Sequence, residues 1–184
     1  MPFARAGKNA TGKAKKSEAG RAAAQMRPTV GPAFIVTSLS LFKNGFQALY
    51  EATPDARINL IKQGIEPAAL NTLAVTMNEP KETIIGMLRL SRATVDRKAR
   101  EHKLLPIDES ERVLGMANLI GQVEKMVAES GNPDGFNAAH WVARWLRKPL
   151  PALNGRMPAE FMDTMEGQRM VENLLARAQA GAYA

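Results

Sequence analysis

Hydrophobic positions along most of the chain recur three or four residues apart, which is the spacing of one helix face. The longest such pattern spans 108–130 and consists of Val113, Ala117, Ile120, Val123 and Val127. Few runs alternate apolar and polar residues, and the apolar triplet at 34–36 is too short and isolated to indicate a sheet. The pattern therefore predicts an all-α protein.

Capping residues and prolines divide this pattern into short helices. Thr53 is expected to cap a helix that has Pro54 at its first position. Asp108, followed three residues later by Glu111, resembles a capping box and should open a helix that ends near Ser130. Further helix starts are expected near positions 67, 80, 91, 136, 158 and 164, and the last helix should end at Gly181.

Residues 1–31 differ from the rest of the chain in composition. They are mostly Ala, Gly, Lys and Arg, with seven basic residues and one acidic residue, whereas the remaining residues include 18 basic and 17 acidic ones. A segment with so little to bury is expected to be a disordered basic arm, although organellar transit peptides have a similar composition. The net charge of +7 therefore belongs mainly to the arm and indicates little about the folded part.

The residues that usually carry catalysis are scarce. The chain has no cysteine, which excludes thiol nucleophiles and Cys-ligated metals and suits a reducing cytoplasm. His102 and His140 each lack a second ligand at metal spacing, and no phosphate-binding glycine loop is present. No apolar run is long enough to span a bilayer. We therefore expect a cytoplasmic binding protein, not an enzyme, with no cofactor, metal, small-molecule substrate or membrane partner.

Residues 80–103 have the proportions of a helix-turn-helix, with two short helices joined by a three- or four-residue turn. Between 87 and 107 there are six basic residues and two acidic ones. Helical spacing places Val95, Ala99 and His102 on one face of the second helix, which would pack through Val95 and Ala99. The opposite face carries Ala93, Arg97 and Arg100. A solvated cationic helix pair is the alternative to DNA binding.

The docking geometry of such motifs assigns the candidate DNA contacts. The first residues of the second helix reach base edges in the major groove, while flanking cations bind phosphates. The expected base contacts are Arg92, Ala93 and Arg97. The expected phosphate contacts are Arg89, Lys98, Arg100 and Lys103.

Two further groups of apolar residues leave alternatives open. Trp141 and Trp145 are four residues apart and belong either to a partner-binding face or to the core. The methionines near the C-terminus indicate either an adaptable interface or buried packing. They are Met157, Met162, Met165 and Met170.

An ordered series of motifs gives a more specific signal. The series runs GIEP at 64–67, LRLSRATV at 88–95, LLPIDESER at 104–112, WL at 145–146, PALNGRMP at 151–158, DTMEG at 163–167, VENLLAR at 171–177 and GAYA at 181–184. With these motifs, residues 60–184 resemble an antitoxin of the Xre/MbcA/ParS type from a type II toxin–antitoxin system. The usual partner of such an antitoxin is a RES-domain or ParT-like toxin.

The resemblance implies a protein of two functional parts behind the arm. Residues 32–128 would form a helix-turn-helix region that dimerises and binds promoter DNA, and residues 129–184 a toxin-binding domain whose tail blocks the NAD-binding active site of the toxin. RES-type toxins consume NAD, whereas ParT-type toxins transfer ADP-ribose. The implied toxin-binding residues are Asn154, Gly155, Arg156, Arg177, Gly181, Ala182, Tyr183 and Ala184.

The chemistry of these residues suits that role. A pocket for NAD expects phosphates, so a cation such as Arg177 or Arg156 beside Tyr183 would fit it, although Tyr183 packing on the last helix is an alternative. Asn154 stands where the family has a glycine, and asparagine also tolerates positive φ. Met157 stands where a small polar residue is commoner.

The sequence therefore predicts an antitoxin that neutralises its toxin and represses its own promoter. The alternative is a stand-alone helix-turn-helix transcription regulator with a C-terminal dimerisation domain. A toxin gene beside that of the antitoxin would favour the first. The operator, the stoichiometry, the toxin chemistry and the roles of the arm and of residues 32–60 stay open.

Overall fold

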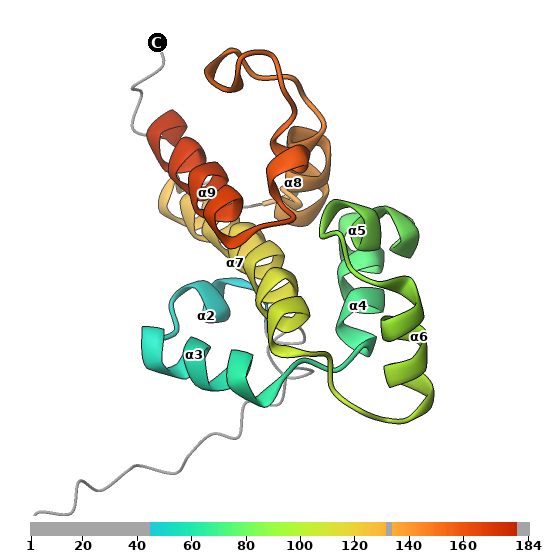
Figure 1. Cartoon of the computed structure of the whole chain (residues 1–184). Helices are drawn as coiled ribbons and strands as arrows, with labels where there is room; N and C mark the ends of the chain where they lie inside the picture. The colour runs from blue at the N-terminus through green and yellow to red at the C-terminus, as the bar shows by residue number, and fades with distance from the viewer. Residues whose placement is uncertain (1–44, 132–133, 180–184) are drawn as a thin grey trace, which may run out of the picture. The chain divides into compact units, whose positions relative to one another are not determined.

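The computed structural model describes residues 45–131 and 134–179, and in these ranges the regular structure is entirely helical (Figure 1). The α-helices are α2 (Gln47–Tyr50), α3 (Pro54–Gln63), α4 (Ala68–Met77), α5 (Lys81–Met87), α6 (Arg92–Arg100), α7 (Ile107–Glu129), α8 (Ala138–Leu146) and α9 (Met165–Gln179). Two 3-10 helices, η2 (Pro151–Leu153) and η3 (Pro158–Phe161), lie between α8 and α9. The all-α prediction is confirmed. The arm, the triplet at 34–36 and residues 181–184 lie outside the described residues.

Local capping signals position two of the helices as expected. The Thr53 hydroxyl accepts the backbone N–H of Ala56 at 3.3 Å, with Pro54 at the first helical position of α3. The Ser91 hydroxyl accepts the backbone N–H of Thr94 at 3.2 Å and so caps α6. A side-chain oxygen at these positions satisfies a backbone donor that the helix itself leaves unpaired.

The start of α7 differs from the prediction. The helix begins at Ile107 after Pro106, two residues earlier than a capping box with Asp108 as its N-cap would place it. The Asp108 carboxylate lies inside the first turn and pairs instead with Arg112, 3.0 Å away. An acidic side chain in the first turn still stabilises the helix dipole, so the helix keeps a favourable start without the box.

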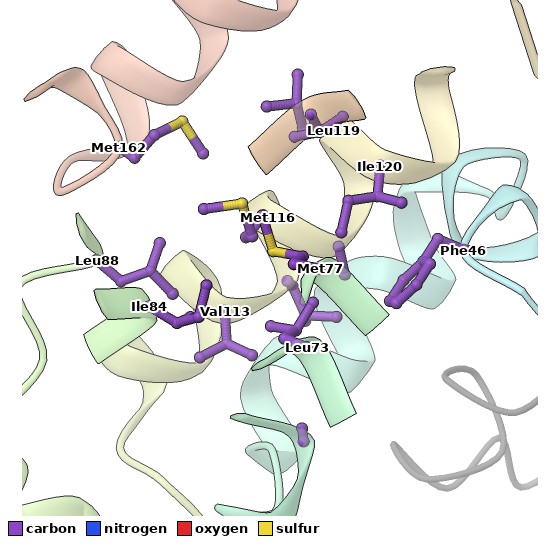
Figure 2. Close-up of a cluster of buried hydrophobic side chains, with 14 of the residues drawn as sticks. Phe46, Leu73, Met77, Ile84, Leu88, Val113, Met116, Leu119, Ile120 and Met162 are labelled. Atoms are coloured by element: carbon purple, nitrogen blue, oxygen red, sulfur yellow. The ribbon is translucent and has the colours of Figure 1, made fainter. Parts of the chain in front are cut away.

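The long helix α7 organises the core. It packs against α2, α3, α4, α8 and α9, and its buried side chains Val113, Met116, Leu119 and Ile120 meet those of the surrounding helices (Figure 2). Their labelled neighbours are Phe46, Leu73, Met77, Ile84, Leu88 and Met162. The described helices thus belong to one compact unit, and both expected functional regions share the core of α7.

Two glycines of α7 allow neighbouring segments to approach closely. A Cβ atom at Gly121 would lie 2.2 Å from the carbonyl oxygen of Phe46, just before α2. A Cβ atom at Gly115 would lie 1.6 Å from Oε1 of Gln168 on α9. Both distances are far below van der Waals contact. Because the atom met at Gly121 belongs to the backbone, the chain at Phe46 occupies its position only against glycine, whereas a larger residue at 115 would force the Gln168 side chain to move.

The helix α2 was not expected from the sequence, and α7 explains how so short an element is held. The Glu124 carboxylate of α7 accepts the backbone N–H of Gln47 at 2.6 Å, at the first position of α2. Burial raises the pKa of the Glu124 carboxyl, while the backbone donors of Gln47 and Phe46 oppose that rise. The start of α2 therefore depends on a side chain distant in sequence.

Candidate functional site

The predicted helix-turn-helix forms from α5 and α6. Leu88 and Leu90 are buried in the turn, and the exposed Arg89 between them adopts a left-handed backbone conformation with φ of 47°. The two buried leucines anchor the turn on the core on either side of Arg89. The turn therefore has a fixed path from α5 into α6.

The packing face of α6 is narrower than predicted. Val95 is fully buried, but Ala99 is exposed, so the expectation that α6 packs through both is wrong. His102, which was expected on the same face, is exposed too. The helix ends at Arg100, and His102 has φ of 51°, so the helical spacing that would bring it over Val95 no longer applies. Ala99 instead lines a groove beside the start of α4.

The side chains predicted to contact DNA lie mostly on the surface of α6 and the segment after it. Arg92, Ala93, Arg97, Arg100 and Lys103 are exposed, and Lys98 is partly buried. This placement leaves the outer face of α6 open to a partner. The contacts with DNA themselves stay predictions.

Ion pairs distinguish these cations from one another. Arg92 lies 3.6 Å from Glu82 and 3.8 Å from Asp96, and Lys103 lies 3.1 Å from Glu101. A hydrogen bond from Lys103 lowers the pKa of the Glu101 carboxyl. Among the described residues, no ion pair involves Arg97, Lys98 or Arg100. The cation nearest the middle of α6, Arg97, is therefore available for a ligand.

Arg89 connects the helix-turn-helix to the C-terminal region. Its guanidinium lies 3.3 Å from the Asp163 carboxylate, in the segment between η3 and α9. Arg112 donates a hydrogen bond to the Arg89 carbonyl at 3.3 Å. The side chain of Arg89 is 82% exposed and that of Asp163 25% exposed, so the pair lies at the surface. Sequence reasoning missed Asp163, because no local pattern signals a partner so distant in the chain.

The predicted toxin-binding turn has the backbone that its sequence requires. Asn154 adopts φ of 54° and Gly155 φ of 79°, as expected for residues that tolerate the left-handed region. The Leu150 N–H donates to the Arg156 carbonyl at 3.1 Å, and the Gly155 N–H donates to the Leu150 carbonyl at 3.0 Å. Asn154, Gly155 and Arg156 are thus displayed on a closed, exposed loop.

Arg156 is held in place although it is exposed. Its Nε donates to Glu160 at 3.0 Å, and its guanidinium lies 4.3 Å from the ring centroid of Phe161. Glu160 also accepts the Met157 N–H at 2.9 Å, and this bond and then that from Arg156 lower the pKa of the Glu160 carboxyl. The loop therefore presents an oriented cation.

The helix α9 is fixed to α7 by apolar and polar contacts. Val171 and Leu175 are buried, and the buried amide of Gln168 donates to the carbonyls of Arg112 at 3.1 Å and of Met162 at 2.9 Å. On its outer side α9 presents Arg177, exposed and in no ion pair with a described residue. The candidates Gly181, Ala182, Tyr183 and Ala184 lie outside the described residues.

A partly buried carboxyl, that of Glu172, lies in the contact between α9 and α7. Glu172 accepts the Asn118 amide at 2.9 Å through its side chain, and its carbonyl accepts the Gln122 amide at 3.2 Å. Burial raises the pKa of the Glu172 carboxyl, against the opposing effect of the Asn118 hydrogen bond. The protonated form of the Glu172 carboxyl is therefore more stable in this contact, relative to the charged form, than it is in water.

The tryptophans of α8 pack against the core and are also partly exposed, so core packing holds in part and the partner-binding face stays a prediction. Their rings are stacked, with centroids 5.8 Å apart and an interplanar angle of 12°, and both rings pack against the core while staying partly exposed. Phe136 extends the array, with its centroid 6.4 Å from that of Trp141, and is 41% exposed. Of the methionines, Met162 is buried, whereas Met157 and Met170 are exposed.

The described residues form neither a cluster of metal ligands nor a membrane-spanning helix. Within 45–131 and 134–179, no three His, Cys, Asp or Glu side chains gather as they would around a metal ion. No helix in the same ranges has the length and apolar character needed to cross a bilayer.

Comparisons with known proteins assign a role to the C-terminal region. Residues 134–181 match the profile of the antitoxin Xre/MbcA/ParS C-terminal toxin-binding domain. The Prs ADP-ribosylating antitoxin of Sphingobium sp. strain YBL2 is 45% identical over 139 residues, which cover 76% of this chain and 87% of that protein. The antitoxin Xre of Pseudomonas putida is 26% identical over 88 residues, which cover 48% of this chain and 50% of that protein.

The helical fold and the matched C-terminal region define an antitoxin, a regulator that binds a toxin and has no enzymatic activity of its own. The chain belongs to the Xre/MbcA/ParS antitoxin family. The resemblance of the ordered motifs to this antitoxin family is confirmed.

Proposed function

We propose that this antitoxin neutralises a cognate NAD-using toxin in the cytoplasm and represses its own promoter as a homodimer. The observation that carries the DNA-binding part is the exposed face of α6, which presents Arg97 without an ion pair to any described residue. An exposed arginine on the second helix of a helix-turn-helix is placed to form bidentate hydrogen bonds with guanine in the major groove.

The other basic residues supply the remaining contacts in this proposal. Arg92 and Ala93 begin α6 and would meet base edges beside Arg97. Phosphates would be bound by Arg89, Lys98, Arg100 and Lys103. A homodimer would place two copies of α6 on successive half-sites, one helical turn of DNA apart.

The toxin that we propose uses NAD. The Sphingobium relative is a Prs ADP-ribosylating antitoxin by name, which supports an ADP-ribose-transferring, ParT-like partner over a RES-domain toxin that consumes NAD. Both chemistries share a pocket for the NAD phosphates. A cationic antitoxin segment therefore suits either toxin.

The toxin would be inhibited by occlusion of that pocket. The proposed occluding residues are Arg177, exposed near the end of α9, and the tail Gly181, Ala182, Tyr183 and Ala184 that follows it. The loop with Asn154, Gly155 and Arg156 would contact the toxin beside the pocket. Arg156 supports this role because Glu160 and Phe161 already hold its guanidinium.

Co-expression with the product of the neighbouring gene tests the proposal. The antitoxin is expected to restore growth and to be recovered with that protein in a pull-down. Deletion of residues 181–184 is expected to abolish growth rescue, and a deletion variant that still neutralises would overturn tail occlusion. Gel-shift measurements with the upstream DNA test repression, and an affinity no greater than that for unrelated DNA would overturn that part.

A further inference from the structure

We propose that one face of α8 is the anchoring surface for the toxin and binds an acidic patch with an apolar centre. This α8 face consists of Phe136, Trp141, Arg144, Trp145 and Lys148. The inference rests on the proposed function, because it assigns toxin binding to a particular surface. In this proposal α8 binds the toxin, whereas the tail blocks the pocket of the toxin.

The aromatic half of the face is preorganised. The Trp141 and Trp145 rings are stacked at 5.8 Å and pack against the buried core, while part of each ring stays exposed. Phe136 continues the array toward the solvent. Rigid aromatic side chains lose little entropy on binding, and tryptophan is enriched among residues that dominate interface energies. The array therefore has the properties of an interface centre.

The other half of the face carries two cations. Arg144 follows Trp141 by three residues within α8 and so lies beside its ring on the helix surface. Lys148 follows the end of α8, where its backbone N–H donates to the Trp145 carbonyl at 3.0 Å. Both cations are exposed, and neither forms an ion pair with a described residue. A partner that covers the rings would therefore gain from acidic groups placed beside Arg144 and Lys148.

The surrounding sequence strengthens this charge argument. Residues 135–159 contain four basic residues and no acidic residue. The other two cations are already paired, Arg147 with Glu79 and Arg156 with Glu160. Arg144 and Lys148 are thus the cations of this stretch that a partner can approach without breaking an ion pair to a described residue.

Two observations favour the toxin over other occupants. The α8 face lies inside 134–181, the segment that matches the toxin-binding domain. A second copy of this chain would bring the same basic stripe against itself in a two-fold interface, and like charges facing each other oppose association. DNA is the remaining candidate, because aromatic rings and cations also bind single strands.

Fluorine NMR tests the face directly, because the chain contains two tryptophans and both lie on α8. Antitoxin labelled with 5-fluorotryptophan should give one signal for each ring, assigned with Trp141→Phe and Trp145→Phe. Unlabelled toxin from the neighbouring gene is expected to shift or broaden both signals, whereas a promoter duplex or single-stranded DNA should leave them unchanged.

The possible results are distinct. A complex confirmed by size-exclusion chromatography with both signals unchanged would overturn the α8 face but not the antitoxin function. Signals that respond to DNA and not to the toxin would overturn the face as a toxin site. Failure of the wild-type chain to form any complex would overturn the proposed function, and this inference with it.

Charge reversal gives an independent test on exposed side chains. The double variant Arg144→Glu/Lys148→Glu is expected to raise the Kd for the toxin at least about tenfold, because it opposes an acidic patch. The matched control is Lys62→Glu, which reverses an exposed lysine on α3 that has no ion pair to a described residue. Equal toxin affinities for the double variant and the control would overturn the proposal.

The same assays should distinguish toxin binding by the α8 face from occlusion by the tail. Deletion of 181–184 is expected to keep the fluorine shifts while losing growth rescue, because α8 still holds the toxin. Loss of the fluorine shifts in the deletion variant would contradict an independent anchor.

Discussion

The helix α6 of the helix-turn-helix and the helix α9 of the C-terminal region are anchored by different numbers of buried side chains. On α6, Val95 is the one buried residue, and the remaining side chains are exposed or partly exposed. On α9, Val171 and Leu175 are buried together with Gln168, whose amide also donates two hydrogen bonds. The candidate DNA-binding helix is therefore lightly anchored, and the helix that leads to the candidate occluding tail is firmly anchored.

The difference indicates how each surface would be presented to its partner. A helix that follows the shape of DNA gains from an open face with projecting cations such as Arg97. A segment that enters a pocket of another protein gains from a fixed support, since less freedom is then lost on binding. This contrast can be tested through the stability of the protein, its affinity for promoter DNA and the ion pair that links the two regions.

The largest effect is expected from truncation of the α9 anchor. Leu175→Ala should lower the free energy of unfolding by about 2–5 kcal/mol, the usual range for a buried leucine. Val95→Ala should cost less, because a smaller side chain is removed and Val95 is the one buried residue of α6. Urea denaturation followed by circular dichroism measures both. A larger loss for Val95→Ala would reverse the proposed order of anchoring.

The next largest effect concerns DNA affinity. Arg97→Ala should weaken promoter binding by about 1–3 kcal/mol and relax the preference at one base pair. Toxin neutralisation should be unchanged, because Arg97 lies outside the matched toxin-binding region. Fluorescence anisotropy with promoter and scrambled duplexes measures both the affinity and the preference.

Lys103→Ala is the matched comparison for Arg97→Ala. Lys103 follows α6 and pairs with Glu101, so its substitution should weaken binding to all duplexes alike and reduce the salt slope by about 1. Equal losses on both duplexes for the two variants would show that α6 is oriented differently from the proposal.

A smaller effect is expected at the polar contact of α9. Because burial raises the pKa of Glu172 in the folded state, the folded protein binds a proton more strongly than the unfolded chain. Stability should therefore fall as the pH rises from the ordinary glutamate pKa through the raised value. Glu172→Gln should remove this fall and raise Tm at neutral pH, by less than Leu175→Ala lowers it. An unchanged pH dependence of Tm would contradict the assignment to Glu172.

The smallest effect is expected at the link between the two regions. Asp163→Asn removes the charge opposite Arg89, and an exposed pair of this kind contributes at most about 1 kcal/mol. Stability should change little, whereas promoter affinity should rise slightly because Arg89 no longer shares its charge. Anisotropy at low salt is the measurement, with Asp55→Asn on α3 as an exposed control. A fall in affinity would show that Asp163 positions Arg89 for DNA.

The parts of this fold that could be predicted from the sequence depend on neighbours in the chain. The hydroxyls of Thr53 and Ser91 accept backbone donors three residues away, so their patterns identify helix starts. Pro54 acts through its own fixed φ at the first helical position. The same local spacing correctly placed Val95 inside. It failed for Ala99 and His102, because the end of α6 and its neighbours decide which side chains are covered.

The missed features depend on residues far apart in the sequence. Glu124 caps α2 from 77 residues away, and Arg89 meets Asp163 across 74 residues. No helical period carries information about such pairs, since packing of α7 with its neighbours creates them. For the same reason the half-exposed state of Trp141 and Trp145 could be recognised only once α8 was placed on the core.

The close fit of Gln168 against Gly115 has a consequence for the exchange of parts between related antitoxins. A recombinant that joined two relatives near residue 128 would combine the α7 of one parent with the α9 of the other. A larger residue at 115 would push the side chain of the incoming Gln168 away from the two carbonyls that it bonds. Positions 115 and 168 are therefore expected to be inherited together, or to change together, in such an exchange.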